Sequence, residues 1–470
     1  MANPFSFYLI TDSHYMSAQN WTDGEPIKVR DRQDNMALIY TPQILDIYID
    51  KILEDKDTDT VIFLGDNIDN GDMNSHYEFR ERLQRLSSGG KNVHIVYATH
   101  DYIGGEDDEC NFQTSKRYLE NSTEPIESMR RANLPDFYYD YTQKNAYSID
   151  KESGSYSVKL TDNILLISII DNGNGRSYCG LFDEGMSWLE DQLIDAKNND
   201  YMVIVCVHHP LLPPHDLYEA FVPSEMLGGR DKLKELFLTY DVRAVFTGHT
   251  HVQSIRKLEN DKGQYLYDIS TVSLANPHGI MRKVSIDTES SFCEVNCISA
   301  DISAIGLPDR ESLYIQHFPG VWESLLQLAA TDYDLFLSEV KGLAPTEKLA
   351  KYRLPIKMVA GKLNKMNMYS LAKHAKVAKD LTSDEKTMAK NMKVADCAFN
   401  ILRHLFTGNG PYTPDSLQYK VIYGFACRID RLKIKKLQNV LHGYSLASVV
   451  EPFLYNNRTG DDNEISFYLK

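Results

Sequence analysis

The stretch VRAVFTGHTH, residues 242–251, carries much of the information about the fold. Its first half, residues 242–246, is short and mostly apolar, which predicts a buried strand. Gly-His-Thr-His follows directly, so two imidazoles stand just beyond the end of that strand. Ligand sites in open α/β sheets lie beyond the carboxyl ends of the strands. The stretch therefore predicts an α/β core with a functional site at the edge of a sheet.

Four other apolar runs end in the same way. Each is followed by carboxylate or imidazole side chains, which are able to bind metal ions or exchange protons. Residues 5–10 precede Asp12-Ser13-His14, and residues 60–64 precede Gly65-Asp66. Residues 93–97 precede His100-Asp101, and residues 203–207 precede His208-His209. Oxygen and imidazole ligands suit borderline divalent metals such as Mn, Fe or Zn. One ion takes about four to six ligands, so this larger pool predicts two ions.

The spacing of apolar residues along the sequence differs between two parts of the chain. Up to residue 305, short apolar runs alternate with amphipathic segments such as residues 35–53 and 185–196, which predicts an α/β sandwich of two sheets. Beyond it, helical spacing prevails in residues 322–340, 346–365, 368–381, 383–406 and 415–431. We therefore predict a catalytic domain at residues 1–305 and an α-helical C-terminal domain at residues 306–470.

The charge is distributed unevenly between these two parts. The 470 residues have a net charge of −16, with 23 Lys and Arg against 17 Asp and Glu from residue 306 onward, and 27 against 49 before it. Phosphates are held mainly by positive charge, so an acidic catalytic domain disfavours specific nucleic-acid binding. Bound cations would still allow a small anionic substrate to bind.

Other features of the sequence bear on location. The apolar runs are too short to span a bilayer, and the first residues lack the basic segment of a signal peptide. Seven scattered cysteines show neither zinc nor disulfide spacing. We therefore expect a cytoplasmic protein with reduced thiols and no membrane partner, and the sequence favours no particular oligomeric state.

In their order along the chain, the five motifs resemble the calcineurin-like metallophosphoesterase superfamily, in its phosphodiesterase-like branch. Its pattern is Asp-x-His, Gly-Asp, Gly-Asn-His-Asp/Glu, a strand-borne His and Gly-His-x-His, and the resemblance covers residues 5 to about 300. It implies a two-sheet sandwich flanked by helices, with a dinuclear metal centre. The ligand roles that it implies are Asp12, His14 and His251 for one ion, His208 and His249 for the other, and Asp66 between both.

The resemblance also implies the chemistry of a metal-dependent phosphoester hydrolase. Two ions would clamp the phosphoryl oxygens, and a metal-bound hydroxide would attack phosphorus. His100 would protonate the leaving oxygen, with Asp101 orienting its ring. A phosphodiester, possible examples being cyclic nucleotides, is the expected small substrate, although the motifs leave monoesters open.

One position departs from the family pattern. Thr99 stands where the family has an Asn whose side-chain carbonyl binds the second ion. A Thr hydroxyl is shorter and a weaker metal ligand, so the second ion is expected to bind less tightly. An alternative function is therefore a catalytically weak, metal-binding scaffold whose helical domain binds a protein partner.

Overall fold

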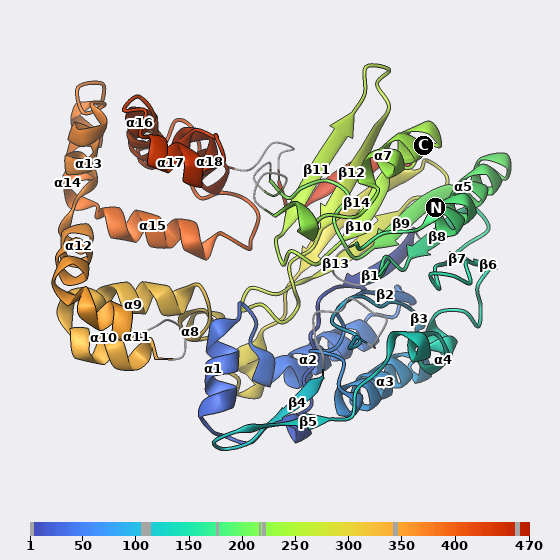
Figure 1. Cartoon of the computed structure of the whole chain (residues 1–470). Coiled ribbons are helices and arrows are strands. Elements are labelled where there is room, and N and C mark those ends of the chain that lie inside the picture. The colour runs from blue at the N-terminus through green and yellow to red at the C-terminus, as the bar shows by residue number, and fades with distance from the viewer. Residues whose placement is uncertain are drawn as a thin grey trace.

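The computed structural model describes residues 4–104, 114–174, 178–215, 218, 222–341, 346–455 and 461–470. Two β-sheets pack into a sandwich with helices on its outer faces, and the C-terminal helices form a curved arm beside it (Figure 1). We call residues 310–454 the helical arm. The predicted fold class, an α/β sandwich with a helical C-terminal region, is confirmed.

The two sheets share one hydrophobic core, which contains residues from both. The six-stranded sheet has the order β15 (Ile465–Tyr468), β14 (Phe292–Ile298), β13 (Met281–Ile286), β1 (Phe5–Ile10), β2 (Thr60–Leu64) and β3 (Asn92–Val96). The seven-stranded sheet has the order β11 (Ser254–Glu259), β12 (Tyr265–Ser270), β10 (Ala244–Thr247), β9 (Met202–Val207), β8 (Ile164–Ile169), β7 (Tyr156–Lys159) and β6 (Ser148–Ile149). A separate hairpin pairs β4 (Ser115–Tyr118) with β5 (Thr123–Ile126).

The strands that carry the sequence motifs are parallel to their neighbours. Strands β1, β2 and β3 run parallel in one sheet, and β8, β9, β10 and β12 run parallel in the other. Their apolar runs are almost completely buried, as expected for strands that are covered on both faces. Because the sheets pack together, the loops after β1, β2, β9 and β10 meet at one edge of the sandwich.

Helices cover the outer faces of the sandwich. On the six-stranded sheet these are α2 (Thr41–Glu54) and α3 (Met73–Ser88), preceded by α1 (Glu25–Gln33). On the seven-stranded sheet they are α5 (Asp183–Asn198) and α7 (Arg230–Thr239). The short helix α4 (Leu134–Phe137) contributes Leu134 to the core between the sheets. None of the helices in the described residues is long and apolar enough to cross a membrane.

The helical arm has two small cores of its own. Its helices are α8 (Arg310–Gln316), α9 (Gly320–Thr331), α10 (Tyr333–Glu339), α11 (Thr346–Lys351), α12 (Arg353–Lys365), α13 (Met368–Ala375), α14 (Ser383–Asn391), α15 (Val394–Arg403), α16 (Leu417–Asp430), α17 (Lys435–Val440) and α18 (Leu446–Leu454). After the arm, the chain returns to the sandwich, where β15 pairs with β14. Residues 465–468, which the sequence placed in the helical domain, thus form a strand of the six-stranded sheet.

The base of the arm is attached to the sandwich by hydrogen bonds. His317 Nε2 lies 2.9 Å from Asp31 Oδ2, and the Phe318 amide donates to the Asp34 carbonyl at 3.0 Å. The His317 ring is fully buried. These contacts fix the end of α1, which lies beside the loops at the strand ends.

Candidate metal centre

The loops after the strands hold their polar side chains in strained backbone conformations. Five of the six predicted metal ligands have positive φ angles of 41° to 66°: Asp12, His14, Asp66, His249 and His251. Non-glycine residues rarely adopt this region, and such strain concentrates at functional sites. Gly248 is needed for the same arrangement, because a Cβ there would overlap Thr11 Oγ1 and Asp12 Oδ2.

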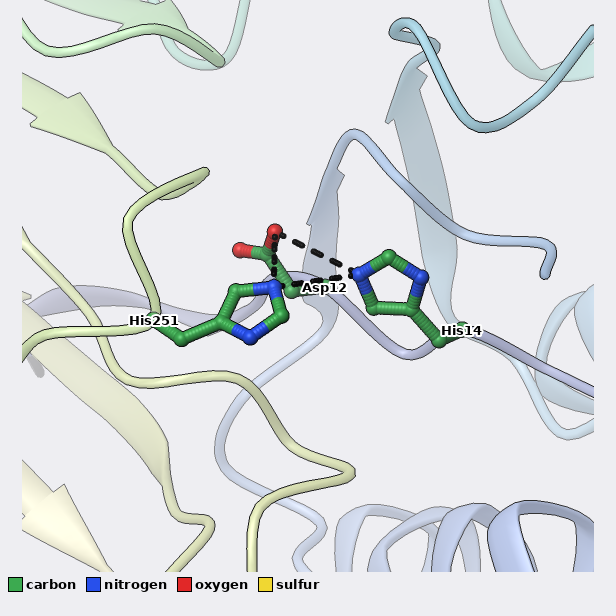
Figure 2. Close-up of side chains that lie close together, drawn as sticks. All are labelled: Asp12, His14 and His251. Atoms are coloured by element: carbon green, nitrogen blue, oxygen red, sulfur yellow. Dashed lines mark hydrogen bonds and ion pairs between the residues drawn. The ribbon is translucent and has the colours of Figure 1, made fainter. Parts of the chain in front are cut away.

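The first cluster contains Asp12, His14 and His251, whose side chains point toward one another (Figure 2). His14 Nε2 lies 3.1 Å from His251 Nε2. Asp12 Oδ1 lies 3.8 Å from the first of these nitrogens and 3.3 Å from the second. Ligands bound to one ion at about 2.0–2.2 Å are separated by similar distances, so the three atoms suit a single metal ion.

The second cluster contains Asp66, His208 and His249. Asp66 Oδ2 lies 2.9 Å from His208 Nε2, and that nitrogen is 3.7 Å from Asp12 Oδ1. The two clusters are therefore adjacent, and both carboxylates, Asp12 and Asp66, come from loops of the six-stranded sheet.

Several atoms of these clusters are buried without a hydrogen bond. Asp12 Oδ1 and His208 Nε2 lie in close ion-pair contacts but form no hydrogen bond of normal geometry with the described residues, and neither does His249 Nδ1. An unsatisfied buried polar atom costs about 1–3 kcal/mol, which an ion bound at that place would offset. The donor set of carboxylate oxygens and imidazole nitrogens fits borderline divalent metals. The residues present therefore fit a metal at each cluster.

Neighbouring groups orient three of the histidines. Asn35 Oδ1 lies 2.9 Å from His251 Nδ1, and the Leu64 carbonyl lies 2.8 Å from His208 Nδ1. Glu225 Oε2 lies 2.7 Å from His249 Nε2. Each contact leaves the other ring nitrogen of that histidine for a metal, as is usual for metal-binding histidines.

The charges of the two clusters strongly influence each other. Burial opposes ionisation of Asp12, but His208 and the nearby imidazoles of His14 and His251 hold its pKa far below the usual range. Burial likewise opposes protonation of His208, whereas Asp66 and Asp12 raise its pKa to about 10. Two ionised carboxylates in a buried place have a high affinity for cations.

The His100 ring lies beside the first cluster. Its centroid is 4.7 Å from that of His14, and its backbone amide donates to Asp66 Oδ1 at 2.8 Å. Asn70 Oδ1 lies 3.0 Å from His100 Nδ1. Burial lowers the pKa of His100 to about 3, against the opposite influence of Asp66.

Asp101 has a different environment from the one that the sequence predicted. Its carboxylate accepts hydrogen bonds from the backbone amides of Ala98, Asn67 and Ile68, at 2.7 to 2.9 Å. The acceptor at His100 Nδ1 is Asn70, so the carboxylate of Asp101 shapes the loop. Its pKa is raised to about 7, mainly by burial and also by Asp66.

Both clusters open into one cavity of about 520 Å³. Four of the predicted ligands line it: His14, Asp66, His249 and His251. Asp34, Asn35 and Glu225 also line it, and so does Thr99, in the position where the family has Asn. Phe318 contributes a wall from the helical arm. No Lys or Arg side chain lines the cavity among the described residues.

A sequence profile described as calcineurin-like phosphoesterase matches residues 5–253. The chain belongs to the calcineurin-like phosphoesterase family. The probable glycerophosphodiester phosphodiesterase GpdQ of Arcobacter nitrofigilis is 28% identical over 195 residues, which are 41% of this chain and 56% of that protein. Similar solved structures include a dimetal phosphatase from Danio rerio, with a TM-score of 0.45, 12% identity, and coverage of 63% of this chain and 96% of that one. Purple acid phosphatase PPD1 from yellow lupin, Lupinus luteus, has a TM-score of 0.41 and 12% identity, and the match covers 68% and 57% of the two chains.

The match thus spans just over half of the curated relative. The resemblance stated from the motifs is confirmed, and the family and this relative support a hydrolase that acts on phosphoester bonds. The six residues predicted as ligands lie in the two clusters, with Asp66 in the second, and its place between two ions stays a prediction. The orienting residues Asn35, Glu225 and Asn70 were not predicted, because no local sequence pattern marks them.

Proposed function

We propose that this phosphoesterase hydrolyses a phosphodiester with two divalent metal ions. Asp12, His14 and His251 would hold one ion, His208 and His249 the other, and Asp66 would lie between them. The observation that carries the proposal is the pair of adjacent, buried ligand clusters at one cavity. Bound divalent ions supply positive charge for the phosphoryl oxygens and lower the pKa of water.

His100 is the proposed proton donor for the leaving oxygen. Asn70 Oδ1 accepts a hydrogen bond from Nδ1, and Nε2 is the nitrogen to which we assign the proton transfer. Burial disfavours the protonated ring. A bound phosphate anion adds negative charge beside it and so favours protonation when the leaving oxygen needs a proton.

The charge of the cavity favours a diester over a monoester. A phosphomonoester dianion carries one more negative charge than a diester. Arg30 lies behind the cavity wall, where its guanidinium is engaged by Asp34 at 2.5 Å and by Asp69 at 2.9 Å. The carboxylates of Asp34 and Glu225 line the cavity itself. The extra charge of a monoester is therefore poorly compensated by this chain's own residues.

Thr99 supports the second candidate function, a metal-binding scaffold with little activity. Its side chain reaches the cavity where the family has an Asn that binds the second ion. The retained His100 beside the clusters favours the enzyme, because a scaffold needs no proton donor.

A substrate panel tests the proposal. Protein loaded with Mn²⁺ or Zn²⁺ is assayed with bis(p-nitrophenyl) phosphate, p-nitrophenyl phosphate and cyclic nucleotides. We expect diesters to react faster by about tenfold or more, because no Lys or Arg of the cavity compensates the second negative charge of a monoester. In the variant Asp34→Asn, the ratio of the diester rate to the monoester rate should be smaller than in the wild type. Faster turnover of the monoester with every metal would contradict the diesterase proposal, and metal binding without turnover would favour the scaffold.

A further inference from the structure

Helix α12 of the helical arm exposes large apolar side chains. Leu354 is 80% exposed, Met358 69%, Tyr352 54% and Val359 52%. Scattered single apolar residues are common on protein surfaces, but four on adjacent turns form a patch. The helix lies at the outer edge of the arm, at the left of Figure 1. This surface has no partner in the described residues of the chain.

Lysines stand among these apolar side chains. Leu354, Met358, Lys362 and Lys365 follow one another at helical spacings of four, four and three, so they lie along a single stripe. Lys351 and Lys357 flank the stripe. Arg353 pairs with Asp334 of α10, which lies within electrostatic range of Lys357, whereas the four lysines form no salt bridge within the part of the chain that the structure describes. We call this surface, residues 351–365, the basic α12 face.

An apolar groove adjoins the basic α12 face. It has a volume of about 800 Å³ and lies between α9, α12 and α15. Its lining residues include Trp322, Leu326, Tyr352, Val359, Phe399 and Leu402. The exposed patch is therefore continuous with a hollow that accepts further apolar groups.

The charges decide between the possible occupants. A symmetric contact between two copies would bring two positively charged faces together, and residues 351–365 contain no Asp or Glu to pair with the lysines of the other copy. Lysines that alternate with exposed Leu and Met are typical of helices that lie in the headgroup region of an anionic bilayer. The excess negative charge of residues 1–305 would turn the sandwich away from such a surface.

We propose that the basic α12 face binds the surface of an anionic lipid bilayer. Leu354 and Met358 enter the headgroup region, and the lysines contact lipid phosphates. This proposal does not rest on the proposed catalytic function. It differs from the expectation of no membrane partner, which rested on the short apolar runs and on the lack of the basic segment of a signal peptide.

Vesicle sedimentation tests the proposal with the full chain. The probes are vesicles of phosphatidylcholine alone and of phosphatidylcholine with phosphatidylglycerol. We expect binding to the anionic vesicles only, weakening as salt is added. Lys362→Glu with Lys365→Glu should weaken binding by about 25-fold or more, since each lysine near the surface contributes about fivefold. Leu354→Gln with Met358→Gln should weaken it by about tenfold or more.

The matched control is Met388→Gln with Lys379→Glu, on and before α14. Met388 is 53% exposed, so the control removes a similar apolar side chain and reverses one positive charge on another surface, and binding should be unchanged. Circular dichroism and thermal unfolding should show that all variants fold, because the changed side chains are exposed. Equal binding to both vesicle types, or no binding to either, would overturn the proposal. So would a concentration-dependent dimer that disappears in Leu354→Gln with Met358→Gln.

Discussion

Asn35 holds the ring of His251, and Asn35→Ala should weaken one metal site selectively. The bond from Asn35 Oδ1 to His251 Nδ1 is 2.9 Å long, and it keeps Nε2 directed at Asp12 and His14 (Figure 2). The other hydrogen bonds of Asn35 involve its backbone: its amide donates to Asp34, and its carbonyl accepts from Asn276. The substitution therefore removes the orienting contact and leaves the loop attached.

The expected loss follows from the usual contribution of such contacts. Removing the partner of a metal-binding histidine typically lowers metal affinity by about 10–100-fold, which corresponds to about 1.4–2.7 kcal/mol. Only the ion at Asp12, His14 and His251 should be affected. Glu225→Ala is the matched variant, because Glu225 contacts His249 of the second cluster at 2.7 Å and alanine removes that acceptor. It should weaken the other ion.

Isothermal titration of metal-stripped protein with Mn²⁺ or Zn²⁺ measures both affinities. Circular dichroism before titration should show an unchanged fold in each variant. Asn35→Asp keeps an acceptor at the same place and should retain most of the affinity. Unchanged binding of both ions in Asn35→Ala, or equal weakening of both, would refute the role of Asn35.

Three further predictions concern the proton donor, the departure from the family and the arm. His100→Gln should leave metal content unchanged and lower turnover by about 10²–10⁴-fold for a poor leaving group, but less for p-nitrophenolate; loss of metal would show that His100 is a ligand. Thr99→Asn should lower the metal concentration for half-maximal activity, because an amide oxygen is the better ligand, and no change would show that residue 99 does not contact the second ion. Burial lowers the pKa of His317, but the contact with Asp31 outweighs this effect and raises it. The ion pair therefore stabilises the fold fully at pH values below the unfolded pKa of about 6.5. This stabilisation is lost as the pH rises through the pKa of His317 in the folded protein. The difference in unfolding free energy between wild type and His317→Asn should therefore shrink from about pH 6 to about pH 9, and a difference that grows would contradict the pairing.

The strands that carry the site were predictable because each one is marked by a short apolar run in its own sequence. Residues 5–10 and 60–64 were expected as strands and are found as Phe5–Ile10 and Thr60–Leu64. Both are buried on two faces, so an unbroken apolar run marks them without any tertiary information. The polar ligands follow at once, which made the two clusters predictable as well.

Some elements leave weaker patterns in the sequence. Helix α1 was missed because it buries only Ile27 and Asp31 and therefore has almost no apolar stripe. Residues 322–340 were expected as one helix but form α9 and α10, because the Asp332 side chain caps a new helix by accepting from the Leu335 amide. Strand β15 has only four residues, and its pairing with β14 is a contact between distant parts of the chain.

The residues that orient the histidines of the site were not predictable, because they too depend on contacts between distant parts of the chain. Asn35 and His251 are 216 residues apart, so no spacing in the sequence connects them. Asp101 shows the opposite case. It was assigned to His100 by its position in the motif, whereas the tight turn directs its carboxylate to nearby backbone amides. Motif order predicts which residues gather, but the loop conformation decides which atoms meet.

The dependence of rate on bound metal tests the proposed dinuclear phosphodiesterase most directly. Metal-stripped protein is loaded stepwise with Mn²⁺, bound metal is measured by mass spectrometry, and hydrolysis of bis(p-nitrophenyl) phosphate is measured at each loading. We expect the rate to stay low up to one bound ion per chain and to reach its plateau at two. A plateau at one ion would contradict the dinuclear centre, and two bound ions without hydrolysis would contradict a catalytic role.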